Sequence, residues 1–369
     1  MEVSRANLIH NLRAVRSSIP KTAKVCAVVK ADAYGHGAEF VARVAENEDL
    51  VQYFAVANMD EAERLRSADV HLPILIMSRV PTEELAELVK YELRPTIWSY
   101  QEAKRFQEGL RGSEQKLRVH LKIDTGMARL GLSARLIDLA ATIKEVRAIS
   151  KLPNIELEGV FSHFATAVGD SDYQRYQFNL FKNLLDLLAA EGINFQLRHI
   201  ANSATILDHP EMSLDMVRAG IVLYGCHEGA GDIKLDLKPV MHYQSKISDI
   251  RYIAKGETVG YGRTWRAERP TRLAVMEAGY SDGLLRSLSN RGIVSIAGQR
   301  CPLVGKVCMD RSMIDITDLK GGKIGEAVHI FGGPEPDYIG ADEQAALAGT
   351  ISYELFCVVN RRVPRIYID

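Results

Sequence analysis

The sequence lacks the features of a membrane-spanning or nucleic-acid-binding protein. Its 369 residues include 46 Lys and Arg and 47 Asp and Glu, so the net charge is −1 and no excess of one sign attracts nucleic acid or an anionic membrane. The longest apolar runs, such as residues 26–29 and 73–77, are far shorter than the roughly 20 residues that cross a bilayer. These absences favour a small neutral or zwitterionic partner.

The sequence also lacks the patterns of a disulfide framework or a metal site. No two cysteines form a CxxC pair, and the ten histidines show no HxH or HxxxH spacing, so we expect neither a structural zinc site nor another metal. The first residues do not form a charged head followed by an apolar core, so we expect a cytoplasmic protein with reduced thiols. The five cysteines are Cys26, Cys226, Cys301, Cys308 and Cys357.

Residues up to 225 alternate short apolar runs with longer segments of helical periodicity, which is typical of a parallel sheet built from βα units. Eight strands are predicted, and eight is the number that closes a (β/α)8 TIM barrel. The predicted strands are residues 25–29, 53–57, 74–77, 95–98, 117–123, 157–161, 197–201 and 215–218. Helices are expected to begin near Asp60, after Ser99 in a capping box with Glu102, and over residues 133–149 and 173–190.

After Gly225 the sequence becomes rich in glycine, and residues 228–232 resemble a linker. Strands are predicted at residues 243–253, 272–276 and 293–297, and a helical pattern returns from 343 to about 359. We therefore expect an α/β protein with a (β/α)8 barrel domain at residues 1–228, followed by a mainly β C-terminal domain at residues 229–369.

In such barrels the active site lies at the carboxyl ends of the strands, and the residues there are unusually polar. Lys30 ends an apolar strand, so its ammonium needs a partner or a lowered pKa. A lysine of this kind suits Schiff-base chemistry, although for Lys30 taken alone a solvated lysine or one ion-paired with Asp32 is the commoner case. After the last two strands, Ser203 and the amides of Gly220 and Ile221 are typical donors to a phosphate.

Several motifs together resemble the alanine racemase family. Residues 27–37, AVVKADAYGHG, resemble its pyridoxal-phosphate lysine signature, and residues 122–131, KIDTGMARLG, resemble its second motif. The resemblance covers essentially the whole chain in family order. The remaining matching segments are SHFA at 162–165, HIANS at 199–203, RAGIVLYG at 218–225, VGYGRTW at 259–265, GYSDG at 279–283, VCMD at 307–310 and SYE at 352–354.

The resemblance implies a pyridoxal 5'-phosphate enzyme that interconverts L-alanine and D-alanine with two bases. Lys30 would hold the cofactor and exchange the Cα proton of D-alanine, and Tyr261 would exchange that of L-alanine. Two groups on opposite faces are the most direct route to racemisation, because one lysine cannot easily reach both faces. His163 and Arg218 are the neighbours expected to make the Tyr261 phenol a better base.

The resemblance also assigns cofactor-binding and substrate-binding residues. Arg218 would donate to the pyridine nitrogen and, because a guanidinium only donates, would keep that nitrogen unprotonated. The other residues that match cofactor-binding positions are Tyr34, His163, Asn202, Ser203, Gly220, Ile221 and Tyr353, with Tyr353 also at the substrate entrance. His36 and His199 are interpreted as supports behind these residues.

Arg129 and the backbone amide of Met309 match the site of the substrate carboxylate, with Asp310 as a supporting residue. Lys122 matches a lysine that is often carbamylated in the family; an unmodified, ion-paired lysine is the alternative. Its strand parity places Lys122 on the face opposite Leu121 and Ile123. Ala128 stands where many relatives have glycine.

The family arrangement is a head-to-tail homodimer in which each active site takes its tyrosine from the other subunit. The alternatives are a pyridoxal-phosphate homeostasis protein, against which the second domain argues, a decarboxylase for basic amino acids, and a racemase for serine or larger side chains. The product D-alanine would supply peptidoglycan synthesis, or the enzyme would degrade it.

Overall fold

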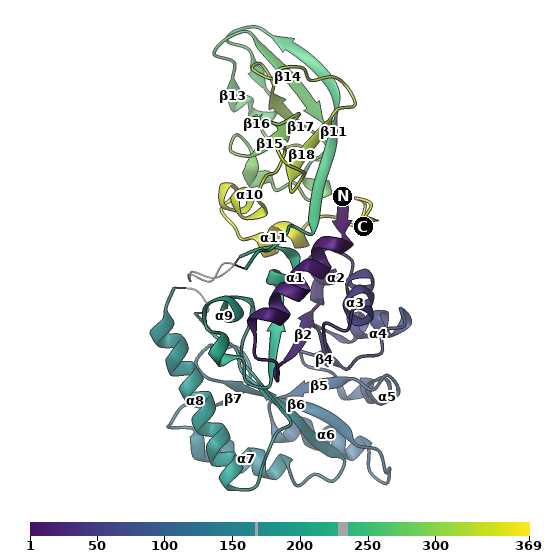
Figure 1. Cartoon of the computed structure of the whole chain (residues 1–369), viewed down its shortest axis with the longest axis vertical. Coiled ribbons are helices and arrows are strands. Elements are labelled where there is room, and N and C mark those ends of the chain that lie inside the picture. Colours follow the sequence, from purple (N-terminus) through teal and green to yellow (C-terminus); the bar gives the residue numbers. More distant parts are fainter. Residues whose placement is uncertain (167–168, 228–234) are drawn as a thin grey trace. The chain divides into compact units, whose positions relative to one another are not determined.

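Residues 1–166, 169–227 and 235–369 are described by the computed structural model, and they fall into two units (Figure 1). The barrel unit comprises Ile9–Ala33 and Ala38–Leu237, and the C-terminal unit comprises Met1–Leu8, Tyr34–Gly37 and Lys238–Asp369. The linker and the domain boundary predicted at Glu228 and Gly229 lie outside the described residues.

The barrel unit contains eight parallel strands that close into a barrel. Their order is β10-β2-β3-β4-β5-β6-β8-β9, and the backbone bonds from Asp215 N to Arg198 O and from Arg218 N to Ala201 O, both 3.0 Å, join β10 to β9. The predicted (β/α)8 barrel is therefore confirmed. The strands are β2 (Lys24–Val28), β3 (Tyr53–Val56), β4 (Ile74–Ile76), β5 (Arg94–Ile97), β6 (Leu117–Asp124), β8 (Ile155–Phe161), β9 (Leu197–His199) and β10 (Met216–Ala219), and β7 (Leu132–Ser133) pairs with β6 outside this circuit.

Strands β3 and β4 of the barrel are apolar along their whole length, because a parallel sheet is covered on both faces. Every residue of β3 and β4 is buried. The helices lie around the outside of the sheet and mostly follow a strand in sequence (Figure 1). They are α1 (Arg5–Ser18), α2 (Lys30–Tyr34), α3 (Ala38–Asn47), α4 (Met59–Ser67), α5 (Leu85–Lys90), α6 (Tyr100–Gly109), α7 (Leu139–Ile149), α8 (Ser171–Ala190) and α9 (Ser203–Asp208). The exceptions are α1, which precedes β2, and α2, which is a short left-handed turn.

The predicted helix starts are partly confirmed. The Ser99 hydroxyl accepts from Glu102 N at 3.2 Å and caps α6 as expected, although the Glu102 carboxylate accepts from Trp98 N instead of Ser99 N. The helix predicted from Ser133 was wrong at its start: α7 begins at Leu139, because Ser133 pairs in β7 and its hydroxyl binds Asp138 at 2.7 Å. Helix α8 agrees with the prediction.

The C-terminal unit is mainly β, as predicted. Six antiparallel strands form a closed circuit, since β11 pairs with both β18 and β14. The helix predicted over residues 343–359 is two helices, because Gly349 adopts φ +74° and ends the first. The elements are β1 (Glu2–Ser4), β11 (Met241–Ile253), β12 (Thr258–Val259), β13 (Trp265–Arg266), β14 (Thr271–Met276), β15 (Ile293–Ile296), β16 (Gln299–Val304), β17 (Ser312–Asp315), β18 (Ala327–Phe331), α10 (Ala341–Ala348), α11 (Ser352–Cys357) and β19 (Ile366–Ile368).

Among the described residues, no helix combines the length and the apolar character that crossing a membrane requires.

The turn that follows β2 has an uncommon backbone conformation. Ala31, Asp32, Ala33 and Tyr34 all have φ between 52° and 57°, the left-handed region. This region costs a non-glycine residue roughly 1–2 kcal/mol. Helix α4 stabilises the turn: the Glu61 carboxylate accepts from Ala31 N and from Ala57 N, both at 2.7 Å. Glu61 thus holds the backbone beside Lys30 in place.

Replacing Glu61 with alanine is expected to lower the free energy of unfolding by about 3 kcal/mol, because two backbone amides lose a charged acceptor. Urea unfolding monitored by circular dichroism measures the loss. Glu63→Ala, on the same helix, is the control and should change stability by less than about 0.5 kcal/mol. Equal losses in the two variants would mean that Glu61 supports only the helix.

Candidate active site

The residues that the sequence predicts for the barrel site follow the carboxyl ends of its strands. Lys30 comes two residues after β2, and Arg218 lies on β10, the neighbour of β2 in the sheet. His163 comes two residues after β8, and Asn202 and Ser203 follow β9. The fold thereby brings these side chains to one end of the barrel, as the sequence predicted.

Arg218 is a buried cation, 4% exposed, with an unusual set of acceptors. Its Nη2 donates to Ser162 O at 2.9 Å and to Ile200 O at 3.1 Å, and its Nη1 donates to His199 Nδ1 at 3.0 Å. No carboxylate of the described residues forms an ion pair with it. Burial lowers the pKa of Arg218 to about 10, so it remains charged at neutral pH.

His163 is oriented by Arg218. Its Nδ1 accepts from Arg218 Nη2 at 3.2 Å. Burial, followed by the charges of Arg218 and Lys122, holds the pKa of His163 well below its usual value. The ring is therefore neutral, with its proton on Nε2, because the guanidinium can only donate to Nδ1.

Lys122 is a second buried amine in this region, 6% exposed. Its Nζ lies 4.8 Å from the centre of the Phe161 ring and 3.4 Å from Ile123 O. Burial, Arg218 and Arg129 hold the pKa of Lys122 well below its usual value, with Asp124 opposing them. No ion pair with a carboxylate is found for Lys122 in the described part of the chain, which disfavours the ion-paired alternative.

Arg129 lies on an exposed loop after β6. The Asp124 carboxylate organises this loop by accepting from the amides of Gly126, Met127 and Ala128 at 2.9–3.0 Å. Ala128 has φ 57°, a left-handed conformation that glycine adopts at less cost. The turn is therefore strained at Ala128.

The segments after β9 and β10 are linked through Ser203, which is 2% exposed. The Ser203 hydroxyl oxygen accepts from Gly220 N at 3.0 Å and from Val222 N at 3.4 Å. Asn202 caps the helix α9 by accepting from Thr205 N at 3.1 Å, and Ile221 begins a short 3-10 helix, Ile221–Tyr224. The Ser203 hydroxyl keeps its own proton as a donor, whereas the Gly220 amide already donates to the Ser203 oxygen.

The remaining predicted residues belong to the C-terminal unit. Tyr261 is 73% exposed and Met309 is 54% exposed, and together with Asp310 they line one hollow of about 740 Å³. Asp310 accepts from Arg362 Nη2 at 2.7 Å. Tyr261 and Met309 are thus two exposed apolar side chains that line the same hollow.

Tyr34 and Tyr353, also in the C-terminal unit, form an aromatic pair. Their ring centres lie 5.5 Å apart with an interplanar angle of 56°. The structure therefore brings together two residues that the sequence analysis assigned to cofactor binding.

Sequence reasoning missed the residues that support this site. Glu61 gave no signal, because it reads as an ordinary residue in the first turn of α4. Arg94, His120 and Glu158 are buried polar residues in apolar strands, and their position in such strands was a usable signal. His120 shares the strand parity of Lys122, which the sequence did show.

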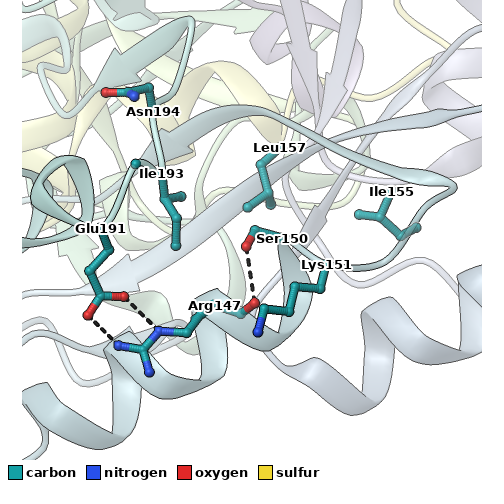
Figure 2. Close-up of a pocket in the computed structure, with 9 residues that line it drawn as sticks. Arg147, Ser150, Lys151, Ile155, Leu157, Glu191, Ile193 and Asn194 are labelled. Carbon is teal, nitrogen blue, oxygen red and sulfur yellow. Dashed lines mark hydrogen bonds and ion pairs between the residues drawn. The ribbon is translucent and has the colours of Figure 1, made fainter.

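Another hollow lies between the end of α7, the end of α8 and the start of β8 (Figure 2). It faces the amino ends of the strands, where barrels of this kind do not place catalysis. Its only charged pair in the figure joins Arg147 to Glu191, with Nε to Oε2 at 2.8 Å, so these charges satisfy each other.

Comparisons with known proteins agree with the fold and the motif order. The family model for the alanine racemase N-terminal domain matches residues 3–228, and that for the C-terminal domain matches residues 240–367. A relative named alanine racemase 2 from Caldanaerobacter subterraneus subsp. tengcongensis is 43% identical, over 100% of this chain and 94% of the relative.

Solved structures give the same result. An alanine racemase of Clostridium difficile 630 has a TM-score of 0.92 and 36% identity, covering 100% of this chain and 94% of that one. The structure of alanine racemase from Bacillus anthracis with bound L-Ala-P has a TM-score of 0.90 and 32% identity, with the same coverage. On this full-length similarity, the chain belongs to the alanine racemase family of isomerases.

Proposed function

We propose that this protein uses pyridoxal 5'-phosphate to interconvert L-alanine and D-alanine, with Lys30 and Tyr261 as the two catalytic bases. The observation that carries the proposal is the buried positive charge at the mouth of the barrel. Arg218 lies there without a carboxylate partner among the described residues, and an unpaired buried charge is costly. An anionic cofactor and an amino-acid carboxylate would compensate it.

The residues present fit the cofactor. Lys30 would bind its aldehyde, and Arg218 and the neutral His163 would contact its ring. The phosphate would be held by the Ser203 hydroxyl, the Gly220 and Ile221 amides, Asn202, Tyr34 and Tyr353. When bound, pyridoxal phosphate withdraws electrons from the substrate Cα and acidifies its C–H bond.

The two bases act at the substrate Cα from opposite faces. Lys30 removes or returns the proton of D-alanine, and Tyr261 that of L-alanine. Arg129 and the Met309 amide bind the substrate carboxylate, and Asp310 supports that site. With residues 1–228 holding the cofactor and residues 229–369 supplying Tyr261, the two proposed domains have distinct tasks. The D-alanine produced would supply peptidoglycan synthesis, or the enzyme would degrade it.

The exposure of Tyr261 supports a homodimer with shared sites. A tyrosine with 73% of its surface exposed has few contacts to hold it, whereas a catalytic base must be fixed. The face with the hollow around Tyr261 and Met309 would receive the barrel of a second copy, and a two-fold axis would then form two identical sites.

The activity is tested by incubating the purified protein with pyridoxal phosphate and L-alanine and following D-alanine by chiral chromatography. We expect D-alanine to reach equal amounts with L-alanine, and L-serine and L-lysine to react at least about tenfold more slowly. Carbon dioxide release from L-lysine would identify a decarboxylase instead. Cofactor binding without turnover of any of the three would identify a homeostasis protein.

Shared sites are tested by mixing inactive Lys30→Ala and Tyr261→Phe chains and allowing the subunits to exchange. A mixed dimer has one site with both defects and one intact site, so activity should recover toward roughly a quarter of normal. Tyr252→Phe, at another exposed tyrosine of the same unit, is the active control. No recovery, with exchange verified by mass spectrometry of differently tagged chains, would exclude shared sites.

We propose that Lys122 is carbamylated, because its amine is buried, burial lowers its pKa, and the neutral amine is the form that reacts with carbon dioxide. A carbamate would place a negative charge near Arg218 and Arg129 and so stabilise both guanidinium groups. In 13C-labelled bicarbonate at pH 8, we expect one carbamate signal by NMR that disappears in Lys122→Arg but persists in Lys116→Arg, an exposed residue just before β6. A signal that survives Lys122→Arg would refute this assignment.

A further inference from the structure

A continuous chain of hydrogen bonds connects Arg218 to four other polar side chains. Arg218 Nη1 lies 3.0 Å from His199 Nδ1, and His199 Nε2 lies 2.9 Å from His120 Nδ1. His120 Nε2 lies 3.3 Å from Glu158 Oε2, which also accepts from Arg94 Nε at 3.1 Å. Each of the five residues is at most 6% exposed.

The chain runs through the inside of the barrel. His120 on β6 contacts His199 on β9, although β8 separates these strands in the sheet. Arg94 on β5 reaches Glu158 on β8, with β6 between them. Side chains of strands that are not neighbours meet only on the inner face of a closed sheet. The chain therefore crosses the barrel core.

The direction of each bond is fixed by chemistry. A guanidinium only donates, so His199 Nδ1 must accept from Arg218. Burial and the nearby charge of Arg218 lower the pKa of His199 well below its usual value, so this ring is neutral and carries its proton on Nε2. It follows that His120 Nδ1 accepts and that His120 Nε2 carries the proton donated to Glu158.

The series of donated hydrogen bonds that begins at Arg218 ends at the Glu158 carboxylate, which accepts from His120. Burial alone would raise the pKa of Glu158, but the hydrogen bond with His120 and the charge of Arg94 lower it to about 2. The carboxylate is therefore ionised under all physiological conditions. Because linked hydrogen bonds polarise one another, it makes His199 Nδ1 a stronger acceptor for Arg218.

The residues around His120 and His199 pack closely against the two rings. Gly159 pairs with His120 in the sheet, next to a register shift between Val119 and His120. A Cβ on Gly159 would lie 2.5 Å from His120 Cε1 and Nδ1. The His199 ring stacks on Phe161, with centres 4.9 Å apart and planes 6° apart. Both histidine rings are thus fixed by packing as well as by hydrogen bonds.

We propose that Glu158 is a positioning residue for racemisation, which acts through the tautomers of His120 and His199 to hold the Arg218 guanidinium in its orientation at the mouth of the barrel. The inference rests on the role proposed for Arg218 at the cofactor ring. The inference adds a set of positioning residues that extends from Arg218 across the barrel core to the Arg94–Glu158 ion pair.

The first measurement is 15N NMR of the histidine rings in the 15N-histidine-labelled holoenzyme and in the protein stripped of cofactor, both at pH 7. His120 and His199, assigned by single His→Gln substitutions, should be neutral and protonated at Nε2 in both forms. A proton on Nδ1 of either ring in the unsubstituted protein would overturn the proposal. This result does not depend on activity, so it stands apart from any failure of the proposed function.

The second measurement compares E158Q with E156Q, a matched change on the same strand at a half-exposed ion pair with Arg118. In E158Q we expect mixed tautomers at His120 and a fall of about tenfold in kcat, with KM for alanine changed less than about twofold. E156Q should match the unsubstituted enzyme. Unchanged tautomers and kcat in E158Q, or equal losses in both variants, would overturn the proposal. If E158Q does not fold, the tautomers of the unsubstituted protein decide.

Discussion

Positive charge buried without a protein carboxylate is the constraint on which the proposed site depends. Arg218 is held by carbonyl oxygens and neutral histidine nitrogens. Such groups orient a cation but do not neutralise it. The folded chain therefore keeps an uncompensated positive charge at the carboxyl end of β10, which an anionic ligand neutralises. A site with such a charge attracts anions electrostatically, whether or not they also form hydrogen bonds there.

The barrel supplies the rigidity that this charge requires. The groups that accept hydrogen bonds from Arg218 lie in three places: just after β8, on β9, and just after β9. Because they lie on different segments, no single loop movement can release the guanidinium. The left-handed turn beside Lys30 is fixed from outside by Glu61 on α4. Proposed chemistry on opposite faces of one carbon needs bases held to within a fraction of an ångström, and these contacts provide that precision on the barrel side.

The fold was predictable because its strands are short apolar runs of the expected number and spacing, and the eight predicted strands agree with β2–β6 and β8–β10 to within a few residues. What the sequence could not predict arises from tertiary contacts. Ser133 pairs with β6 instead of starting a helix, and Glu2–Ser4 joins the C-terminal sheet beside β11 and β19. Neither pairing can be recognised from a periodic pattern of apolar residues in the local sequence. Gly349, by contrast, was a visible signal for the break between α10 and α11.

The candidate site shows the same division. Lys30, Arg218 and His163 follow from strand ends and motif order, whereas Glu61 and the Arg94–Glu158 pair act from other elements of the barrel, and their partners become apparent only in three dimensions. Single-sequence reasoning finds the residues that face a ligand more readily than the residues that orient them, because orientation depends on neighbours that are distant in the chain.

The most direct test of the buried-charge account is the thermal unfolding midpoint of the holoenzyme compared with that of the protein stripped of pyridoxal phosphate. Because a ligand that binds only the folded state stabilises it, we predict that removal lowers Tm by roughly 5 °C or more, and that pyridoxal phosphate restores it while pyridoxal without phosphate restores only part. Equal midpoints with and without the cofactor would contradict the account.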